Sequence, residues 1–407
     1  MWVGTKGYGI YLFDIENYNE LAHLTHKKNK PESLCSDAVF HILKDNKNRI
    51  WVASFENGGI GLAQETKEGI TFKNFITGKG NKSMIRYLYQ DNKERIWGGT
   101  SDGLVRFNPG ELIRNPDAYV FYNMDLTSPR TIRNIQEQFG FTFKKGLGQN
   151  FLTSRNILEE IVDAAEIESG VIEVGPGFGV LTSELAQNSD KVVTIEIDER
   201  LIDVLDYTLA EYDNVKIINE DILKLDLKKV IDDEFNGEKV SIAANLPYYI
   251  TTPIITKLLE EKLPIKNIVV MVQKEVAERM SAKPSTKDYG AITVLCQYYT
   301  EPSIVANVPA SLFVPPPKVD SAVLKLKVLD KPSVEVKDEG VFFRVVKAAF
   351  SQRRKTLLNC LSANFPIPKD EISTLLESIG IAPSRRGETL SLEEFANIAD
   401  TLLQKIK

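Results

Sequence analysis

The sequence predicts an α/β fold with a doubly wound parallel sheet, preceded by repeated β-strands and followed by a small helical domain. Three observations carry this prediction. Strand-like and helix-like segments alternate from residue 157 to about 260, a tryptophan-containing motif repeats before residue 115, and helices are expected after a charged break at 330–332. The domain boundaries are therefore predicted at 1–123, 124–328 and 329–407.

The N-terminal repeat has the form Asp-Asn-Lys-x-Arg-Ile-Trp. It spans 45–51 and recurs 46 residues later at 91–97, and residues 2–11 match the part of the repeat that begins at the tryptophan. All three tryptophans of the chain occupy this one position. A period in the forties with Asp/Asn turns and short strands is typical of propeller blades. The segment resembles the propeller repeats in the sensory half of two-component regulators.

The number of repeats is too small for a closed propeller. About two and a half units are present, whereas closed propellers have ~4–8 blades. The chain also starts in mid-repeat, which indicates a leftover fragment from a gene fusion or a misplaced start codon, with Met124 as the natural beginning. A small interaction module, or a partial propeller completed by another chain, is the functional alternative.

The central part of the chain alternates between apolar strands and helices, as a parallel sheet requires. Helices are predicted over 180–187 and 199–211, and a helix start at 127–130 and a capping box at 391–394 mark two others. Strands are predicted over 171–174, 192–196, 215–218, 240–244, 268–273, 303–308 and 321–328.

Composition excludes several classes of protein. Apolar residues make up 43% of the chain, so a large core is expected, and no apolar run approaches the ~20 residues of a membrane span. No signal peptide is visible, and three widely spaced cysteines favour a reducing cytoplasm without disulfides or zinc. All three histidines lie in the first 41 residues, which excludes histidine-based catalysis and histidine-rich metal sites from the rest. The net charge of −6 means that any surface for nucleic acid is local.

A glycine loop and three polar residues follow four successive predicted strands. A glycine loop with Gly175 and Gly177 joins the first strand to its helix, Glu196 lies 21 residues after Gly175, Asp221 lies 25 further, and Asn245 lies 24 beyond that. Each interval is about one strand–helix unit, so all four are expected at the carboxyl edge of the sheet, where open α/β folds bind ligands. A Glu196 carboxylate can hold both hydroxyls of a ribose, and Asp221 can accept from an adenine amino group. Acidic loop residues are common in α/β proteins, but a glycine loop and three polar residues at this regular spacing are not.

The segment Asn245-Leu246-Pro247-Tyr248 predicts the chemistry. It ends a buried strand with an amide, a rigid proline and an aromatic ring. The amide oxygen and backbone carbonyls can accept hydrogen bonds from an exocyclic amino group, and the ring offers a face for a flat base. This set suits methylation of the amino nitrogen of a base.

Residues 130 to about 405 resemble the ribosomal RNA adenine dimethyltransferases, and no motif is missing. Within that family the start of the match and the segment at 350–357 resemble the small-subunit enzyme, and the erythromycin-resistance enzymes of 23S rRNA are the alternative. The motifs that carry the resemblance lie at 144–152, 173–179, 195–198, 220–221, 245–248, 313–321 and 350–357.

The resemblance implies a Rossmann-like class I methyltransferase domain, a helical RNA-recognition domain and no metal. The expected substrate is a pair of adjacent adenosines in the 3′-terminal hairpin of 16S rRNA, methylated at N6 by a monomeric enzyme. Tyr248 and Phe313 would stack on the two faces of the adenine, and the Asn245 side chain and the Pro247 carbonyl would accept its amino protons. The expected contacts to S-adenosylmethionine come from Asn150, Leu152, Gly175, Gly177, Glu196, Asp221 and Asn245.

Local charge predicts where RNA binds. Residues 341–368 contain five basic and no acidic residues, and the basic run at 353–355 is expected on a helix. A solvated helix face is the alternative explanation. The predicted phosphate-contacting residues are Lys144, Lys145, Lys318, Arg353, Arg354 and Lys355.

Two further classes of protein remain open from the sequence. One is a sensory or binding protein in which the β-repeat dominates and the second half is vestigial. The other is a nicotinamide oxidoreductase, because such enzymes use a similar glycine loop. Against the second, position 180 is Val where the dinucleotide motif has its third glycine.

Overall fold

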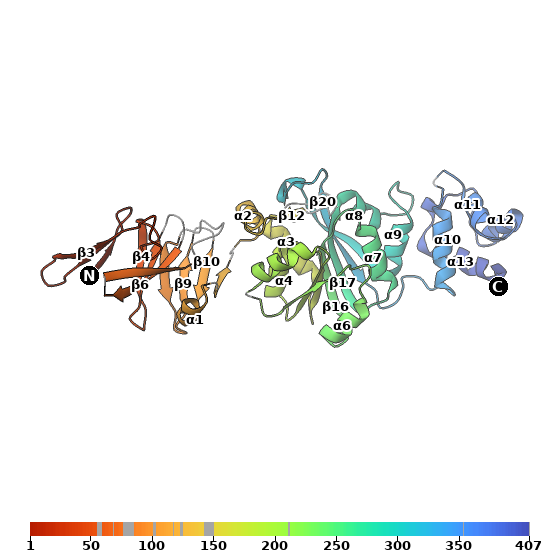
Figure 1. Cartoon of the computed structure of the whole chain (residues 1–407). Helices are drawn as coiled ribbons and strands as arrows, with labels where there is room; N and C mark the ends of the chain where they lie inside the picture. Colours follow the sequence, from red (N-terminus) through yellow and green to blue (C-terminus); the bar gives the residue numbers. More distant parts are fainter. Residues whose placement is uncertain are drawn as a thin grey trace. The chain divides into compact units, whose positions relative to one another are not determined.

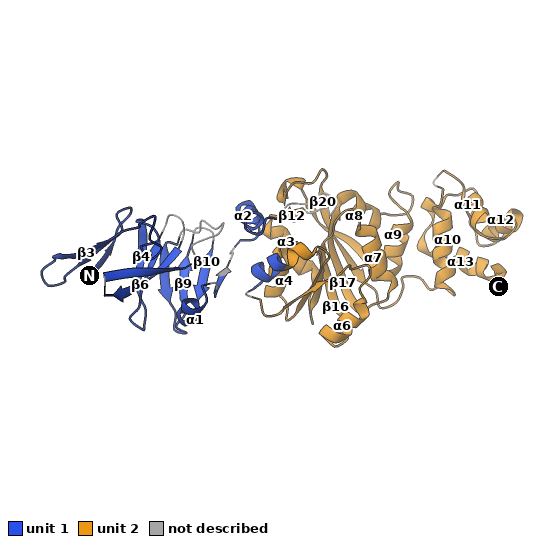
Figure 2. Ribbon diagram, in the orientation of Figure 1, with its two compact units in different colours: residues 1–143, 203–211 blue, residues 144–202, 212–407 orange. Residues whose placement is uncertain are grey.

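The computed structural model in Figure 1 describes residues 1–54, 59–67, 69–75, 85–100, 103–116, 118–122, 125–141, 150–210, 212–352 and 354–406, with side chains at 121 and 122 left out. The chain divides into two compact units, coloured separately in Figure 2. The first comprises residues 1–143 with 203–211, and the second comprises 144–202 with 212–407.

The described residues of the first unit form three small antiparallel sheets, of three, four and four strands. The helices α1 (Pro109–Arg114) and α2 (Pro129–Phe139) belong to the same unit, and α2 begins at the predicted Ser128-Pro129 signal. A closed propeller is not formed by these residues. The sheets comprise β1 (Trp2–Gly4), β2 (Ile10–Phe13) and β3 (Glu20–Leu24); β4 (Val39–Lys44), β5 (Ile50–Ser54), β6 (Gly59–Thr66) and β7 (Gly69–Phe75); and β8 (Tyr87–Gln90), β9 (Ile96–Gly99), β10 (Leu104–Phe107) and β11 (Tyr119–Tyr122).

In each copy of the repeated motif, the carboxylate of the first residue, an aspartate, accepts four hydrogen bonds. One Asp45 oxygen accepts from the backbone N–H groups of Lys47 and Arg49, both at 2.9 Å. The other accepts from Arg49 Nε at 2.6 Å and from Trp51 Nε1 at 2.9 Å. Asp91 repeats the same four contacts with the residues at 93, 95 and 97. The repeat therefore encodes a turn that anchors the tryptophan of the following strand.

The second unit is built on a mixed sheet of seven strands in the order β15-β14-β13-β16-β17-β20-β18. The first five of these run parallel, as predicted, whereas β20 is antiparallel to both β17 and β18. The strands are β13 (Val171–Val174), β14 (Val192–Glu196), β15 (Val215–Asn219), β16 (Val240–Asn245), β17 (Ile265–Gln273), β18 (Thr300–Val308) and β20 (Ser321–Val328). A separate pair, β12 (Phe151–Leu152) and β19 (Phe313–Val314), is antiparallel.

Helices cover both faces of this sheet, so the central parallel strands β13 and β14, and β16 up to its last residue, are buried, whereas the edge strand β15 is partly exposed. Side chains of α6, α7, α8 and α9 share one core with the sheet, and α3 packs on the strands from outside that core. The helices of this unit are α3 (Arg155–Ala165), α4 (Val180–Gln187), the 3₁₀ turn η2 (Glu199–Leu201), α6 (Leu227–Phe235), α7 (Thr251–Glu260), α8 (Lys274–Met280), α9 (Ala291–Tyr299) and η3 (Ala310–Leu312). Helix α5 (Ile202–Thr208) follows η2 but belongs, from residue 203, to the first unit.

The C-terminal helices have a core of their own, which includes Val294 and Tyr298 of α9. The predicted capping box is present, because Ser391 N donates to Glu394 at 2.9 Å and Glu394 N donates back to Ser391 Oγ at 3.2 Å. None of the described helices is long and apolar enough to cross a bilayer. The helices are α10 (Glu339–Ala349), α11 (Leu357–Asn364), α12 (Lys369–Ser378), η4 (Gly387–Thr389) and α13 (Leu392–Ile406).

The helix predicted for the basic run is wrong. Helix α10 ends at Ala349, and Arg354 and Lys355 lie in the connection to α11. Thr356 accepts from Asn359 N as the N-cap of α11, so a new helix begins only after the basic residues. Arg353 lies outside the described residues.

We expect Asp45→Asn to lower the free energy of unfolding of the first unit by about 2–3 kcal/mol, because an amide nitrogen would face the N–H donors of Arg49 or Trp51. All tryptophans of the chain lie in this unit, so denaturant unfolding followed by tryptophan fluorescence reports on it alone. The matched variant Asp91→Asn should have a smaller effect, since Asp91 is more exposed than Asp45. Unchanged unfolding of both variants would contradict the anchoring role.

Candidate active site

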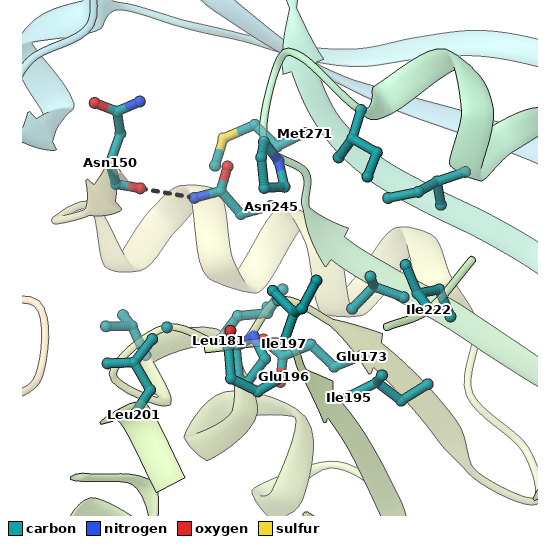
Figure 3. A pocket seen from close by; sticks show the side chains of 18 of the residues that line it. Asn150, Glu173, Leu181, Ile195, Glu196, Ile197, Leu201, Ile222, Asn245 and Met271 are labelled. Atoms are coloured by element: carbon teal, nitrogen blue, oxygen red, sulfur yellow. Dashed lines mark hydrogen bonds between the residues drawn. The ribbon is translucent and has the colours of Figure 1, made fainter. Parts of the chain in front are cut away.

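A pocket lies at the carboxyl ends of β13, β14, β15 and β16, where the sequence predicted it. It encloses about 1050 Å³ of empty space, part of it open to solvent. Of the predicted cofactor contacts, the pocket lining includes Asn150, Leu152, Gly175, Gly177, Glu196, Asp221 and Asn245. In Figure 3 the Asn150–Asn245 pair lies at one end of the pocket and Glu196 with Glu173 at the other.

The glycine loop after β13 uses its glycines for two different purposes. Gly175 and Gly177 both have positive φ angles, of 71° and 60°, which other residues adopt only with strain. A Cβ at Gly175 would meet no atom within 4 Å, so this position is open. A Cβ at Gly177 would lie 2.7 Å from the ring of Phe151, which stacks on Phe178 with centroids 4.3 Å apart. Gly175 thus leaves room for a ligand, and Gly177 leaves room for an aromatic pair.

Glu196 ends β14 as a buried acid, 5% exposed. Burial raises its pKa to about 7, against the lowering effect of backbone N–H groups from Asp198, Gly177 and Ile197. The bond from Asp198 N to Glu196 Oε1 is 2.8 Å long. A carboxylate buried in this way can bind donors of a ligand, and the two hydroxyls of a ribose are such donors.

Sequence reasoning assigned no role to Glu173, which also lines the pocket. It lies within β13, is 1% exposed, and accepts a hydrogen bond of 2.5 Å from Thr182 Oγ1. Burial, and to a lesser degree the nearby Glu196 charge, raise its pKa to about 8. Its position inside an apolar strand, where a charge is unfavourable, was the signal that could have identified it.

Asp221 lies in the turn after β15 and is half-buried at the pocket wall. Its Oδ1 accepts from Leu223 N at 3.0 Å, which fixes the turn. The carboxylate is therefore oriented before any ligand arrives.

The Asn245 side chain at the end of β16 has a defined orientation. Its Nδ2 donates to the backbone carbonyl of Asn150 at 3.0 Å (Figure 3). Because a carbonyl can only accept, the nitrogen must face Asn150, and Oδ1 remains as the acceptor end of the amide. Leu246 N donates to Met271 O at 3.1 Å, so the backbone after Asn245 is tied to the next strand.

The aromatic residues depart in part from the prediction. The Tyr248 hydroxyl is 2.7 Å from Ser321 Oγ, which anchors its half-buried ring to β20. The neighbouring Tyr249, which sequence reasoning missed, lines the pocket and is 56% exposed. Phe313 is only 2% exposed, because it pairs with Leu152 between β12 and β19. Its ring does not present the open face predicted for it.

Pro247 lines the pocket, but its carbonyl is engaged. It accepts from Ile250 N and from Thr251 Oγ1, each at 3.2 Å. Both lone pairs of this oxygen therefore already have donors. For the predicted contact to a base, one of these long hydrogen bonds must open.

The predicted RNA contacts are only partly described. Lys318, Arg354 and Lys355 have exposed side chains. Lys144 and Lys145, like Arg353, lie outside the described residues.

This fold and site define a class: a Rossmann-like sheet with a glycine loop, a buried acid and an oriented amide at one edge is typical of S-adenosylmethionine-dependent methyltransferases. The family model for ribosomal RNA adenine dimethylase matches residues 140–404, and the chain belongs to that family. The nicotinamide alternative is thereby excluded.

Relatives agree with this assignment. The chain is 54% identical over 285 residues to "Ribosomal RNA small subunit methyltransferase A" of Bacillus mycoides, covering 69% of this chain and 98% of the relative. The protein of the same name from Bacillus anthracis matches with the same identity and coverage. Among solved structures, a dimethyladenosine transferase from Plasmodium falciparum is 30% identical, with a TM-score of 0.52, over 61% of this chain and 95% of that one.

We expect Gly175→Ala and Gly177→Ala to separate binding from packing. Gly175→Ala places a methyl group in open pocket space, so affinity for S-adenosylmethionine should fall at least about tenfold, with a loss of about 1–2 kcal/mol in stability from the positive φ. Gly177→Ala adds a clash with Phe151 and should be the less stable variant. Calorimetric titration and thermal unfolding measure the two effects, and wild-type affinity in Gly175→Ala would contradict this division.

We expect affinity for S-adenosylmethionine to rise with pH through about 7. Below the raised pKa of Glu196 the acid is protonated and can no longer accept from two ribose hydroxyls; above it the carboxylate accepts both. The increase should approach about tenfold per pH unit below 7 and vanish in Glu196→Gln. Equilibrium dialysis at pH 6, 7 and 8 measures it, with the exposed neighbour variant Glu199→Gln as control. A flat wild-type profile would contradict the role of Glu196.

Proposed function

We propose that this chain dimethylates the N6 nitrogens of two adjacent adenosines in the 3′-terminal hairpin of small-subunit (16S) rRNA. The observation that carries the proposal is the Asn245 amide, whose nitrogen is held by Asn150 and whose oxygen is left as an acceptor beside the pocket. The choice of small-subunit rRNA rests on the name of relatives that are 54% identical over nearly their whole length.

S-adenosylmethionine supplies an electrophilic methyl group on a sulfonium when it is bound. The residues that would hold it are Glu196 at the ribose, Asp221 at the adenine amino group, and Asn150 with the open loop at Gly175. These groups fit the molecule, because they offer buried acceptors for its hydroxyl and amino donors and a space that a side chain would fill.

The Asn245 oxygen accepts a hydrogen bond from an N–H of the target amino group. This contact draws the nitrogen from a planar toward a tetrahedral shape and aims its lone pair along one direction. A neutral amide suffices, because the proton can leave after transfer and no strong base is needed. Proximity and orientation supply the rate enhancement.

Two aromatic residues are proposed to hold the flipped-out adenine. Tyr248 is anchored through its hydroxyl and stays in place when a base arrives, with stacking worth ~1–3 kcal/mol. Phe313 needs a shift of the β12–β19 pair before its ring can meet the opposite face. The exposed Tyr249 is a second candidate for that contact.

RNA is proposed to approach over the basic residues at 318 and 353–355 and over those at 144–145, and to be selected by the helical domain at 329–407. The catalytic domain would span 124–328. For residues 1–123 we propose propeller-type repeats, supported by the identical Asp45 and Asp91 anchors in successive four-stranded sheets. We propose a cytoplasmic enzyme.

The proposed substrate is tested by mapping dimethyladenosine after incubation with unmethylated small and large ribosomal subunits. Two adjacent N6,N6-dimethyladenosines in the 3′-terminal hairpin of 16S rRNA are expected. Modification of 23S rRNA alone would indicate an enzyme of the erythromycin-resistance type. No methylation of either RNA would favour a vestigial second half.

We expect Asn245→Ala to lower methyl transfer at least about 10²–10³-fold while the fold is retained, since it removes an acceptor that acts on the reacting nitrogen. Asn245→Asp keeps the acceptor but sets a negative oxygen against the Asn150 carbonyl, so activity should also fall. Single-turnover methylation and circular dichroism measure activity and fold. Asn307→Ala, on the exposed edge strand β18, is the control. Full activity of Asn245→Ala would overturn the mechanism.

We expect the double variant Arg354→Glu/Lys355→Glu to weaken rRNA binding and to reduce the slope of log K against log salt by about one per lost phosphate contact. Binding measured from 50 to 200 mM salt tests this. Lys228→Glu, which alters another exposed lysine, on α6, should leave the slope unchanged. An unaltered slope in the double variant would assign these residues to a solvated loop.

A further inference from the structure

The short strand β12 provides the carbonyl that orients Asn245. This carbonyl belongs to the peptide bond between Asn150 and Phe151, and Phe151 is the first residue of β12. The hydrogen bond to it from Asn245 Nδ2 is 3.0 Å long (Figure 3). Because a peptide unit is planar and rigid, a shift of Phe151 moves the carbonyl with it. The orientation of the amide therefore depends on the contacts that hold Phe151.

The ring of Phe151 packs on the glycine loop that follows β13. It stacks on the ring of Phe178, with centroids 4.3 Å apart and planes inclined by 18°, and both rings are buried. The same ring lies against the backbone at Gly177, where a Cβ would come within 2.7 Å of it. Gly177 also lines the pocket. These contacts join β12 to the loop at which S-adenosylmethionine is proposed to bind.

The backbone of β12 is held by β19. Phe151 pairs with Val314 in this antiparallel ladder. Just beyond the strand, Thr153 donates to the carbonyl of Leu312 from both its backbone N and its Oγ1, each at 2.8 Å. These bonds fix the register of the two strands. Phe151 is therefore in contact with the glycine loop through its ring and with β19 through its backbone, and it shares a peptide unit with the carbonyl that orients Asn245.

We infer that Phe151 is a positioning residue for methyl transfer: its ring, stacked on the glycine loop, fixes the peptide carbonyl that orients the Asn245 amide. The inference rests on the proposed function and adds to it a residue that acts through Asn245. An aliphatic side chain at position 151 would stay apolar but would lack the flat face that stacks on Phe178, so β12 could shift. Because a misplacement of about 1 Å can cost about 10²-fold in rate, such a shift would slow the chemical step.

The test is single-turnover methylation of unmethylated small ribosomal subunits by Phe151→Leu, with S-adenosylmethionine and subunits both saturating. The rate should fall about 10–100-fold, because the amide is misplaced even when the cofactor is fully bound. Phe235→Leu is the matched control and should keep the wild-type rate. The ring of Phe235 is also buried and also covers a glycine, since a Cβ at Gly170 would lie 2.3 Å from it, but Gly170 lies at the opposite end of β13.

Cofactor affinity, measured by calorimetric titration, separates positioning from packing. A ring that only supports the glycine loop would change the affinity for S-adenosylmethionine and leave the rate at saturation as in the wild type. That result would overturn the inference. Circular dichroism verifies the fold, and Phe178→Leu, which removes the other ring of the stack, takes the place of Phe151→Leu if the latter does not fold.

A double-mutant cycle with Asn245→Ala decides whether Phe151 acts through the amide. Once the amide is gone, Phe151→Leu has little left to misplace, so its further loss of rate in that background should be below about threefold. Equal losses in both backgrounds would mean that Phe151 acts elsewhere, which overturns the inference alone. If the unaltered chain transfers no methyl group to the subunits, the proposed function fails and the inference fails with it.

Discussion

The parallel pairing of β13 between β14 and β16 is the constraint on which the site depends. Parallel strands end at one edge of the sheet. Residues that are 21–25 positions apart in sequence therefore become neighbours in space through the register of strand pairing alone. A one-residue slip of β16 would turn Asn245 to the other face of the sheet, and the amide would lose the Asn150 carbonyl. The packing of Val240, Ile242 and Ala244 in one apolar core opposes such a slip, because it would turn these side chains out of that core.

The pocket contains both buried and half-buried acids, and the two kinds differ in their surroundings. Glu173 and Glu196 are buried, which favours their protonated forms, and each is kept in place by donors from the protein. Asp221 lies at the wall and is fixed by its own turn. The amide at Asn245 carries no charge, so it is insensitive to this environment and can orient a nitrogen over a wide pH range. The proposed methyl transfer depends on the positions of these side chains, and the carboxyl edge of the sheet fixes those positions.

The sequence was sufficient for the strands of the parallel sheet and for the seven predicted cofactor contacts that line the pocket, because both follow from apolar runs, motifs and spacing. It missed the antiparallel direction of β20, since an apolar run does not state its direction. It placed Arg354 and Lys355 on a helix because nothing in the local composition marks the break that Thr356 creates by capping α11. The burial of Phe313 and the engagement of the Pro247 carbonyl depend on partners far along the chain or on exact geometry, which no motif encodes. Glu173 was passed over because the neighbouring glycines explained its motif.

The bond between Asn245 and Asn150 spans 95 residues, and Leu246 is in turn tied to Met271 in the following strand. The chain is synthesised from its N-terminus, so the Asn150 carbonyl is present long before the Asn245 amide that donates to it. A nascent or truncated chain that ends before β17 contains Asn150 and Asn245 but lacks the strand to which Leu246 is bonded. The hydrogen bonds that orient this part of the pocket are thus complete only after β17 has been synthesised.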